Sequence, residues 1–356
     1  MILFVGLLSC NNEVTQQLEP KSSALGVMNE IVVIADDEIW EGAVGDTFRY
    51  YYESAYPILP QPEPLFDLRH FTIQELDGQP LRKELRSYAI LADLSDEESE
   101  TTRMVKRDMG SEKFNQALTT GSPISSVGKD KWAKGQLLIY LFGSDRDALA
   151  NSIIKNFPAS ANRVNKHDEK QLKSSIYVDR MNIGLTEEIK LNYNIELQVP
   201  GEYRVALRDD DDKILWLRKD ARDAILNIVV QKTKYTDQGQ LSKQNIIAMR
   251  DDFGRKYLTS DKVGNVMVVN SEDLPVYEFT SKIDNHYAKE IRGVWEMTKE
   301  FSGGPFITYL IVNENENEVI YVDLFVLAPG QDKRNIMMQL DYIVKSAKIF
   351  SKGDIN

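Results

Sequence analysis

The chain has one stretch that could enter a membrane, and it lies at the start. Residues 1–9 are apolar or small and carry no charge, and the sole cysteine, Cys10, follows them directly. A helix that spans a bilayer needs about 20 apolar residues, so this stretch is too short. No later apolar run comes near the length of about 18 residues that indicates a span. Everything after the start is therefore expected to fold around a hydrophobic core of its own.

The residues around the cysteine resemble a processing signal. Leu-Leu-Ser-Cys, residues 7–10, is similar to the lipobox of bacterial lipoproteins, in which the cysteine is lipidated and becomes the first mature residue. The resemblance implies a signal peptide over 1–9, a lipidated Cys10 and a polar tether over 10–29. The basic start of a secretory signal is missing, since the first cationic residue is Lys21, and we expect the true start upstream. The alternative is a buried N-terminal strand with an ordinary cysteine.

Charge and cysteine content exclude several classes of function. The sequence has 43 Lys and Arg against 55 Asp and Glu, a formal net charge of −12. Nucleic acids and anionic lipid surfaces both require a basic face, so we expect neither nucleic-acid binding nor a polybasic contact with lipid. One cysteine cannot form an intrachain disulfide, and its lipidation would leave no thiol for catalysis.

The order of β-rich runs and amphipathic segments predicts an α+β protein with mixed or antiparallel sheets covered by helices. Length suggests two domains, which we place at 30–182 and 183–356. Strand, short turn and helix recur at 137–157 and 321–349, which raises the idea of two similar halves. The proline-rich stretch 56–64 must be extended. We expect a rigid connector on the domain surface, with a docking strip for a partner as the alternative.

Common catalytic motifs are absent or incomplete in the sequence, and a Ser-His-Asp triad, whose members meet only in space, stays open. Gly128-Lys129-Asp130 looks like the end of a phosphate loop, but Asp130 stands where a Ser or Thr hydroxyl must hold Mg²⁺. Neither a Gly-x-Ser-x-Gly elbow nor a His-Glu-x-x-His motif occurs. We therefore expect no cofactor and no metal, and we lean towards a protein that is not an enzyme.

Three local expectations concern helices and acidic residues. A helix predicted over Asn285–Phe301 puts His286 and Glu290 on one face, as a weak metal candidate or, more simply, a surface contact. Pro158 is expected to end the helix that contains it. The run Asp209–Asp212 is expected to form a solvated hairpin turn, because it lacks the glycine and the glutamate of a calcium-binding loop.

Six residues are candidates for binding. They are Asp36, Asp37, Trp40, Trp132, Trp216 and Arg218. The two acids follow a β-rich run, where they would form a metal or acid–base site or, as the simpler interpretation, complement a helix N-terminus. The tryptophans would line a ligand groove or, more commonly, belong to the core.

Five segments together resemble a known family. They are Ala35–Trp40, Leu59–Phe66, Trp132–Gln136, Trp216–Arg218 and Gly303–Phe306. The set is similar to a family of Bacteroidota lipoproteins of unknown function, domain-of-unknown-function family 4837, over nearly the whole mature chain. The resemblance implies a location in the cell envelope and a lipidated Cys10. It implies no activity, so no catalytic residue is carried over.

These observations predict a protein held on the outer membrane, in either leaflet, through lipidated Cys10. The favoured role is a non-catalytic binding or assembly component, with another envelope protein as a candidate partner. The alternatives are an envelope hydrolase that uses carboxylates, or a ligand-binding lipoprotein. A deep pocket lined by Trp and Tyr would favour ligand binding, and a shallow surface with an exposed proline strip would favour assembly.

Overall fold

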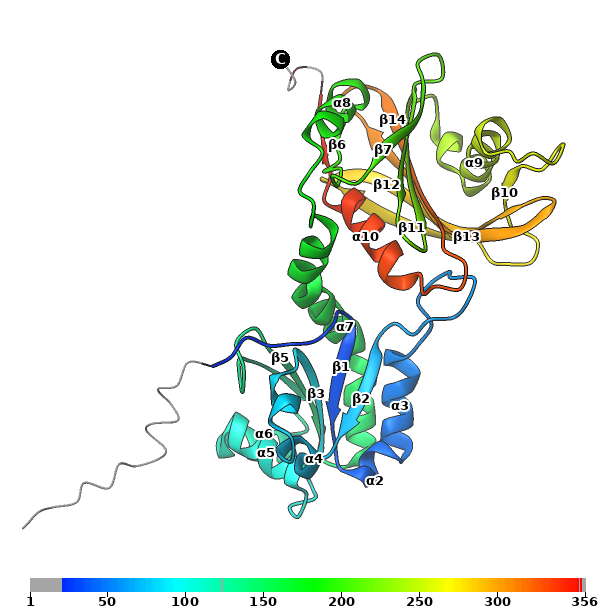
Figure 1. The fold of residues 1–356 in the computed structure, drawn as a ribbon. Helices are drawn as coiled ribbons and strands as arrows, with labels where there is room; N and C mark the ends of the chain where they lie inside the picture. Colours follow the sequence, from blue (N-terminus) through cyan, green and yellow to red (C-terminus); the bar gives the residue numbers. More distant parts are fainter. Residues whose placement is uncertain (1–20, 123, 352, 354–356) are drawn as a thin grey trace, which may run out of the picture. The chain divides into compact units, whose positions relative to one another are not determined.

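The computed structural model describes residues 21–122, 124–351 and 353 (Figure 1). The chain has an α+β fold, as the sequence predicts, and divides into two compact units. The first unit contains Leu65–Asp168 and the described residues before Ala55. The second contains Ala55–Pro64 and the described residues from Glu169 onward. Cys10, its lipidation and the predicted signal peptide lie outside the described residues.

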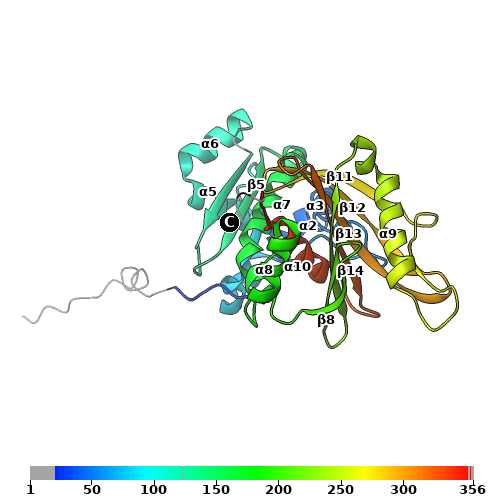
Figure 2. The same ribbon diagram turned by 90° about the horizontal axis from the view of Figure 1, so that it is seen from above.

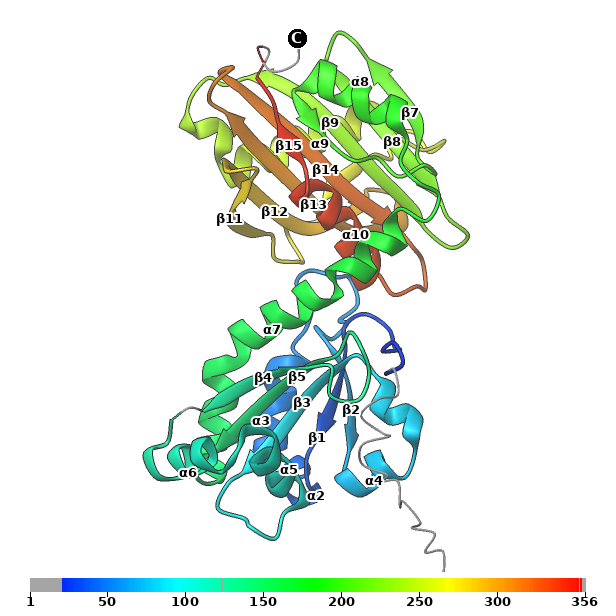
Figure 3. The same ribbon diagram turned by 90° about the vertical axis from the view of Figure 1, so that its left-hand side faces the viewer.

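The first unit is built around a five-stranded sheet with the order β2-β1-β3-β5-β4 (Figure 3). All neighbours are parallel except the edge strand β4. Its strands are β1 (Glu30–Ile34), β2 (Asp67–Phe71), β3 (Ser87–Asp93), β4 (Ser125–Lys129) and β5 (Leu137–Gly143). Its helices are α2 (Asp37–Trp40), α3 (Ala43–Tyr52), α4 (Ile73–Asp77), the 3₁₀ turn η1 (Pro80–Glu84), α5 (Glu100–Met109) and α6 (Ser111–Thr120). Helix α7 (Arg146–Ile176) begins here and ends in the second unit.

Helices cover both faces of this sheet, which explains its continuous apolar strands. Ile31 and Val33 of β1 face a core layer completed by α3 and α7. Val32 and Ile34 face the opposite layer, completed by α4, α5 and α6. A parallel strand that is buried on both faces has no solvent-exposed side chains, so its sequence is an unbroken apolar run.

The second unit is built around a curled antiparallel sheet of eight strands. Its strands are β7 (Arg204–Asp209), β8 (Ile214–Asp220), β9 (Ile225–Lys234), β10 (Met267–Val269), β11 (Tyr277–Ile283), β12 (His286–Met297), β13 (Glu300–Asn313) and β14 (Glu318–Leu327). Its other elements are α8 (Ile183–Tyr193), η2 (Gln238–Leu241), α9 (Lys243–Tyr257), α10 (Arg334–Lys345) and the short pair β6 (Ile195–Glu196) and β15 (Lys348–Ile349).

Helix α9 covers one face of the curled sheet, and α8 and α10 lie on the other (Figure 2). Ile246 and Phe253 of α9 pack with Ile291, Leu310 and Tyr321 of the sheet. The two units therefore differ in sheet topology, one mainly parallel and one antiparallel, and the idea of two similar halves is not supported.

The helix predicted over 285–301 is wrong, because the segment forms β12 and the start of β13. Glu290 and Arg292 occupy alternate positions of β12, yet both are buried. In a half-buried strand, apolar buried residues alternate with polar exposed ones. Here charged residues occupy buried positions, so the sequence does not show that alternation. His286 and Glu290, four residues apart in a strand, lie about 13 Å apart and cannot share a metal as they would on a helix.

The prediction that Pro158 ends a helix is also wrong, since α7 continues through it. Proline removes one backbone hydrogen bond and crowds the preceding turn. The turns on either side are held by burial: Leu149 and Ile153 precede the proline, Val164 follows it, and all three pack in the core of the first unit. Tertiary packing thus overrides the local penalty.

The proline-rich segment is fixed to the second unit at both ends. Its ends meet each other, since Tyr56 N donates to Glu63 O at 2.8 Å. The Glu63 carboxylate accepts from the backbone N–H groups of Lys333 at 2.6 Å and Arg334 at 2.9 Å, at the N-terminus of α10. Tyr56 Oη accepts from the buried Arg292 at 3.3 Å. The segment is thus a rigid connector on the surface of this unit.

Candidate functional site

The second unit contains a pocket of about 680 Å³ beside the N-terminal end of α9. Its lining comes from the residue after β9, from η2, the α9 cap, β11, β12, the end of β13 and the turn that follows it. The residues are Tyr235, Gln238, Leu241, Ser242, Glu278, Tyr287, Lys289, Val312, Asn313, Glu314 and Asn317. Ligand pockets in proteins commonly have volumes of about 300–1,000 Å³. The size therefore suits a small molecule or a short segment of a polymer.

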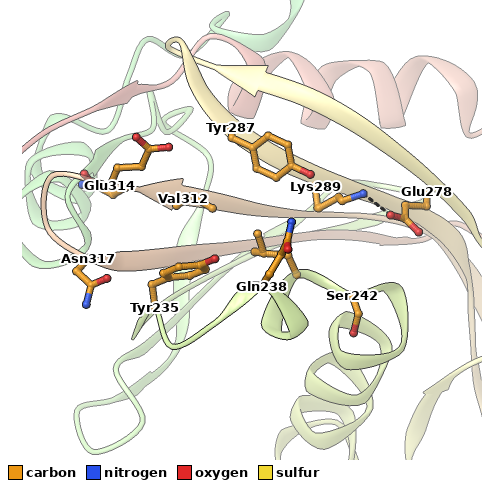
Figure 4. A pocket seen from close by; sticks show the side chains of 11 residues that line it. Tyr235, Gln238, Ser242, Glu278, Tyr287, Lys289, Val312, Glu314 and Asn317 are labelled. Carbon is orange, nitrogen blue, oxygen red and sulfur yellow. Dashed lines mark hydrogen bonds and ion pairs between the residues drawn. The ribbon is translucent and has the colours of Figure 1, made fainter.

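The middle of the pocket has an apolar base and two tyrosine rings beside it. Val312 and Leu241 are buried and form this base. The rings of Tyr235 and Tyr287 lie on either side of Val312 (Figure 4). Tyr287 is 38% exposed, so part of its ring is available to a ligand. Such rings offer flat apolar faces together with a hydroxyl that forms hydrogen bonds.

An ion pair closes one end of the pocket. The Lys289 ammonium donates to the Glu278 carboxylate on the neighbouring strand (Figure 4). This hydrogen bond raises the pKa of Lys289, against the opposing effect of burial. The lysine therefore stays protonated at neutral pH and serves as a hydrogen-bond donor and a fixed charge, not as a base or a nucleophile.

Uncommitted polar groups occupy the rest of the wall. Among the described residues, none forms a hydrogen bond with the side chain of Gln238, Glu314 or Asn317. Glu314 and Asn317 lie at the end opposite the ion pair (Figure 4). Two acids and one base give the lining a net charge of −1. The pocket thus offers donors and acceptors to a polar ligand and favours a neutral or cationic ligand over an anion.

A buried ion pair attaches α9, whose N-cap Ser242 lines the pocket, to the sheet. Arg250 Nε lies 3.2 Å from Asp323 Oδ1 on β14, and both side chains are almost completely buried. Thr308 Oγ1 donates to the same carboxylate oxygen at 2.5 Å. The guanidinium also lies 4.0 Å from the ring centroid of Phe306. Because these contacts attach the middle of α9 to the sheet, they set where Ser242, at its N-terminus, stands.

Three of the sequence-predicted candidates lie together in the first unit. Asp36 precedes α2, but its carboxylate makes no capping bond. It accepts instead from the hydroxyls of Ser99 and Thr101, the latter at 3.0 Å, at the start of α5. Asp37 is exposed in the first turn of α2. Trp40 stacks on the ring of His70, with centroids 4.9 Å apart. The binding role of these residues stays a prediction.

The other candidates are separate from that group. Trp132 packs edge-on against Tyr88 in the first unit, at 5.0 Å between centroids. Trp216 on β8 donates from Nε1 to Asn227 at 3.0 Å and borders the α9 core. Arg218, on the same strand, bonds to Asp220 at 2.8 Å. None of the six candidates lines the pocket, and the binding role of these three also stays a prediction.

The run Asp209–Asp212 forms the turn between β7 and β8, and its acids meet the C-terminal end of α9. Tyr257 Oη donates to Asp209 at 2.6 Å, and Lys256 Nζ lies 2.5 Å from Asp212. The tyrosine hydrogen bond is the main reason that the pKa of Asp209 is lowered to about 2. Within the described part of the chain, no three His, Cys, Asp or Glu side chains gather as a metal-ligand set.

Sequence reasoning missed the pocket residues. They come from segments between Tyr235 and Asn317 that meet only through the antiparallel pairing of β9, β12, β13 and β14. None of them belongs to a motif. The one local signal was the Asn/Glu-rich turn after β13, which the sequence marks as a hairpin and which supplies Glu314 and Asn317.

Two family models match separate parts of the chain. Residues 183–346 match the family model described as Domain of unknown function (DUF4837). Residues 24–177 match a different one, Domain of unknown function (DUF8532). The resemblance to family 4837 is thus supported for the second part of the chain, and its predicted extent over nearly the whole mature chain is corrected. Both matching models are described as domains of unknown function, so neither match assigns an activity.

Other comparisons give little more. Curated protein sequences contain no match. Among solved structures, the crystal structure of LpqN involved in cell envelope biogenesis of Mycobacterium tuberculosis is 13% identical and covers 44% of this chain and 83% of its own, with a TM-score of 0.26. Between residues 21 and 351, leaving out 123, no helix has the length and hydrophobicity to cross a bilayer. Function must therefore be argued from the residues of this chain.

Proposed function

We propose that this protein is a lipid-anchored binding component of the bacterial cell envelope, held on the outer membrane through Cys10, and that it binds a saccharide in the pocket of its second unit. The anchor rests on the lipobox resemblance. Several acyl chains on one residue hold a protein on a membrane, since each buried methylene contributes about 0.8 kcal/mol. The family resemblance to Bacteroidota lipoproteins agrees with this location.

The observation that carries the binding role is the combination of groups in the pocket. Tyr235 and Tyr287 offer flat faces to the C–H face of a sugar ring. Gln238 and Asn317 each offer a donor and an acceptor, as neighbouring hydroxyls require. Lys289 is held protonated, which suits positioning more than proton transfer. The net negative charge disfavours phosphorylated or otherwise anionic ligands.

Binding is tested with a glycan array of neutral and amino sugars, probed with the chain carrying Cys10→Ser. Tyr287→Ala and Tyr235→Ala should each weaken binding about two- to tenfold, the range expected for loss of one aromatic contact. Tyr50→Ala is the matched control, because Tyr50 is 76% exposed in the other unit. No bound glycan, or equal loss with the control, would refute the saccharide site, and cleavage of the glycan would refute the non-catalytic role.

The anchor is tested separately by labelling cells with a clickable fatty acid and fractionating them. The wild-type chain should be labelled and sediment with membranes. Cys10→Ser should lose the label and leave the membrane fraction. A labelled, membrane-bound Cys10→Ser variant would show that the cysteine is not the anchor.

A further inference from the structure

Strand β11 is an open edge of the second sheet. It pairs along all seven residues with β12, from Tyr277 opposite Arg292 to Ile283 opposite His286. It pairs with no other strand of the described chain. Natural proteins usually blunt or cover such an edge, because its free N–H and C=O groups are a template for another strand. An uncovered edge of this length therefore needs an explanation.

The hairpin turn decides which backbone groups of β11 are free. Asp284 and Asn285 join β11 to β12, with φ of 46° and 68°, the geometry of a two-residue type I′ turn. The residues that flank such a turn form a hydrogen-bonded pair, and bonded and non-bonded pairs then alternate. Glu278, Thr280 and Lys282 consequently direct both their N–H and C=O groups outward, six groups in all.

The charges on this edge are self-complementary. Glu278 and Lys282 lie two residues on either side of Thr280, on the same face of the strand. If a second β11 runs antiparallel with Thr280 opposite Thr280, each Glu278 stands opposite the other Lys282. Lys282 forms no ion pair among the described residues, so its charge is available. Opposite charges directly across an antiparallel pair are stabilising.

The other face of the same strand is apolar and exposed. Tyr277 and Phe279 are 47% and 40% exposed, and their rings stack at 6.5 Å. In the register described above, the two copies of Phe279 become diagonal neighbours, a spacing that aromatic side chains can bridge. A second copy would thus cover these rings, satisfy six backbone groups in each chain and form two charge pairs at once.

We propose that β11 is a homodimer interface, in which two copies pair antiparallel about a twofold axis at Thr280 and join their sheets. A closed twofold contact uses the same patch on both partners, as this arrangement does. The contact is one strand wide and smaller than the roughly 1,200 Å² of standard stable interfaces, so the dimer is expected to be weak in solution. The proposal does not depend on the ligand of the pocket.

The decisive experiment is sedimentation equilibrium of Glu278→Lys and Lys282→Glu, alone and mixed, in the Cys10→Ser background. Each variant alone places like charges opposite each other twice and should dimerise about three- to thirtyfold more weakly than wild type. Their mixture restores both opposite-charge pairs and should recover the wild-type dissociation constant. A local defect in either chain, such as loss of the Glu278 contact with Lys289, would not be rescued by mixing.

Two further variants test the backbone contact and the register. Thr280→Pro removes only an outward N–H and should abolish dimerisation, whereas Thr280→Ala should retain it. Thr280→Cys should form an intermolecular disulfide, since Cα atoms of such a pair lie about 5.5 Å apart. Val263→Cys, at a site that is 92% exposed, is the control for random collision.

Three results would overturn the proposal. The first is a wild-type chain that stays monomeric at about 1 mM, the limit of weak association. The second is a dimer that neither charge variant weakens, which would place the interface elsewhere. The third is a monomer whose β11 amides become protected from hydrogen exchange only when a peptide selected from a linear library is added. That result would mean that β11 pairs with a strand of another protein.

Discussion

Removing Asp323 should destabilise the second unit strongly, because it leaves the Arg250 charge buried without its partner. Arg250 is 1% exposed and cannot return to water without moving α9. Its Nη1 and the second carboxylate oxygen of Asp323 have no partner among the described residues, so the single bond at 3.2 Å carries the pairing. Burial raises the pKa of Asp323 even beside this cation, which shows how poorly the site solvates charge.

The expected loss for Asp323→Ala is about 3–5 kcal/mol, the range for breaking a buried ion pair from one side. Thr308, which donates to the same oxygen, adds about 1 kcal/mol when its acceptor is lost. Because whole domains are stable by only about 5–15 kcal/mol, this is a large fraction of the total. Helix α9, whose N-cap Ser242 lines the pocket, would be the first element affected.

Urea unfolding followed by circular dichroism measures the change. Asp252→Ala on the same helix is the matched control, since the Arg255–Asp252 pair has a similar contact of 2.8 Å but side chains that are 53% and 77% exposed. It should cost less than about 0.5 kcal/mol. The double replacement Arg250→Met with Asp323→Leu removes both charges and should cost less than Asp323→Ala alone. A loss below about 1 kcal/mol for Asp323→Ala, or a double replacement equal to the sum of the singles, would refute the reasoning.

Two other predictions concern a glycine and an acid. Gly304→Ala should lower the free energy of unfolding by more than about 2 kcal/mol in urea, because a Cβ there would lie 1.9 Å from Val326 O. The control is Gly184→Ala in α8, where a Cβ would meet one atom, at 3.7 Å, and the change should be neutral or stabilising. Tyr257→Phe should raise the pKa of Asp209 from about 2 towards its ordinary value, measured by NMR titration of the carboxyl carbon. The sign follows from linkage: a lowered folded pKa adds stability above about pH 4 that is lost as pH falls towards 2. The variant should show a smaller dependence of this kind, because the hydrogen bonds from Asp212 N–H and Lys256 remain.

Sequence predicts the first unit better than the second, for a physical reason. β1, β3 and β5 are buried on both faces, so their apolar runs are visible without knowledge of their neighbours. β12 has buried charges at alternate positions, Glu290 and Arg292, which bond to each other and to a distant helix. Arg292, for example, bonds to Asp341 at 3.1 Å on α10. Part of the environment that buries these charges comes from a helix far away in sequence, which the local pattern does not show.

The candidate site was beyond sequence reasoning for the same reason. The candidate acids, Asp36 and Asp37, are adjacent charges directly after an apolar run, a pattern that the sequence shows without knowledge of the fold. The pocket has no such local mark, since Tyr235, Tyr287 and Asn317 are ordinary residues in separate strands and turns. Their meaning comes from the register of the sheet, which the amino-acid pattern does not encode locally.

Glu278 takes part in both proposed sites. Variants of Lys282 and Tyr235, which each belong to only one of them, separate the two proposals. The Glu278 side chain lines the pocket and pairs with Lys289, while its backbone and charge lie on the open edge. Glu278→Lys should therefore weaken both saccharide binding and dimerisation. Lys282→Glu does not touch the pocket and should weaken dimerisation alone, and Tyr235→Ala does not touch the edge and should weaken binding alone. Loss of both properties in Lys282→Glu would mean that the pocket is complete only in the dimer, a coupling that the separate surfaces do not require.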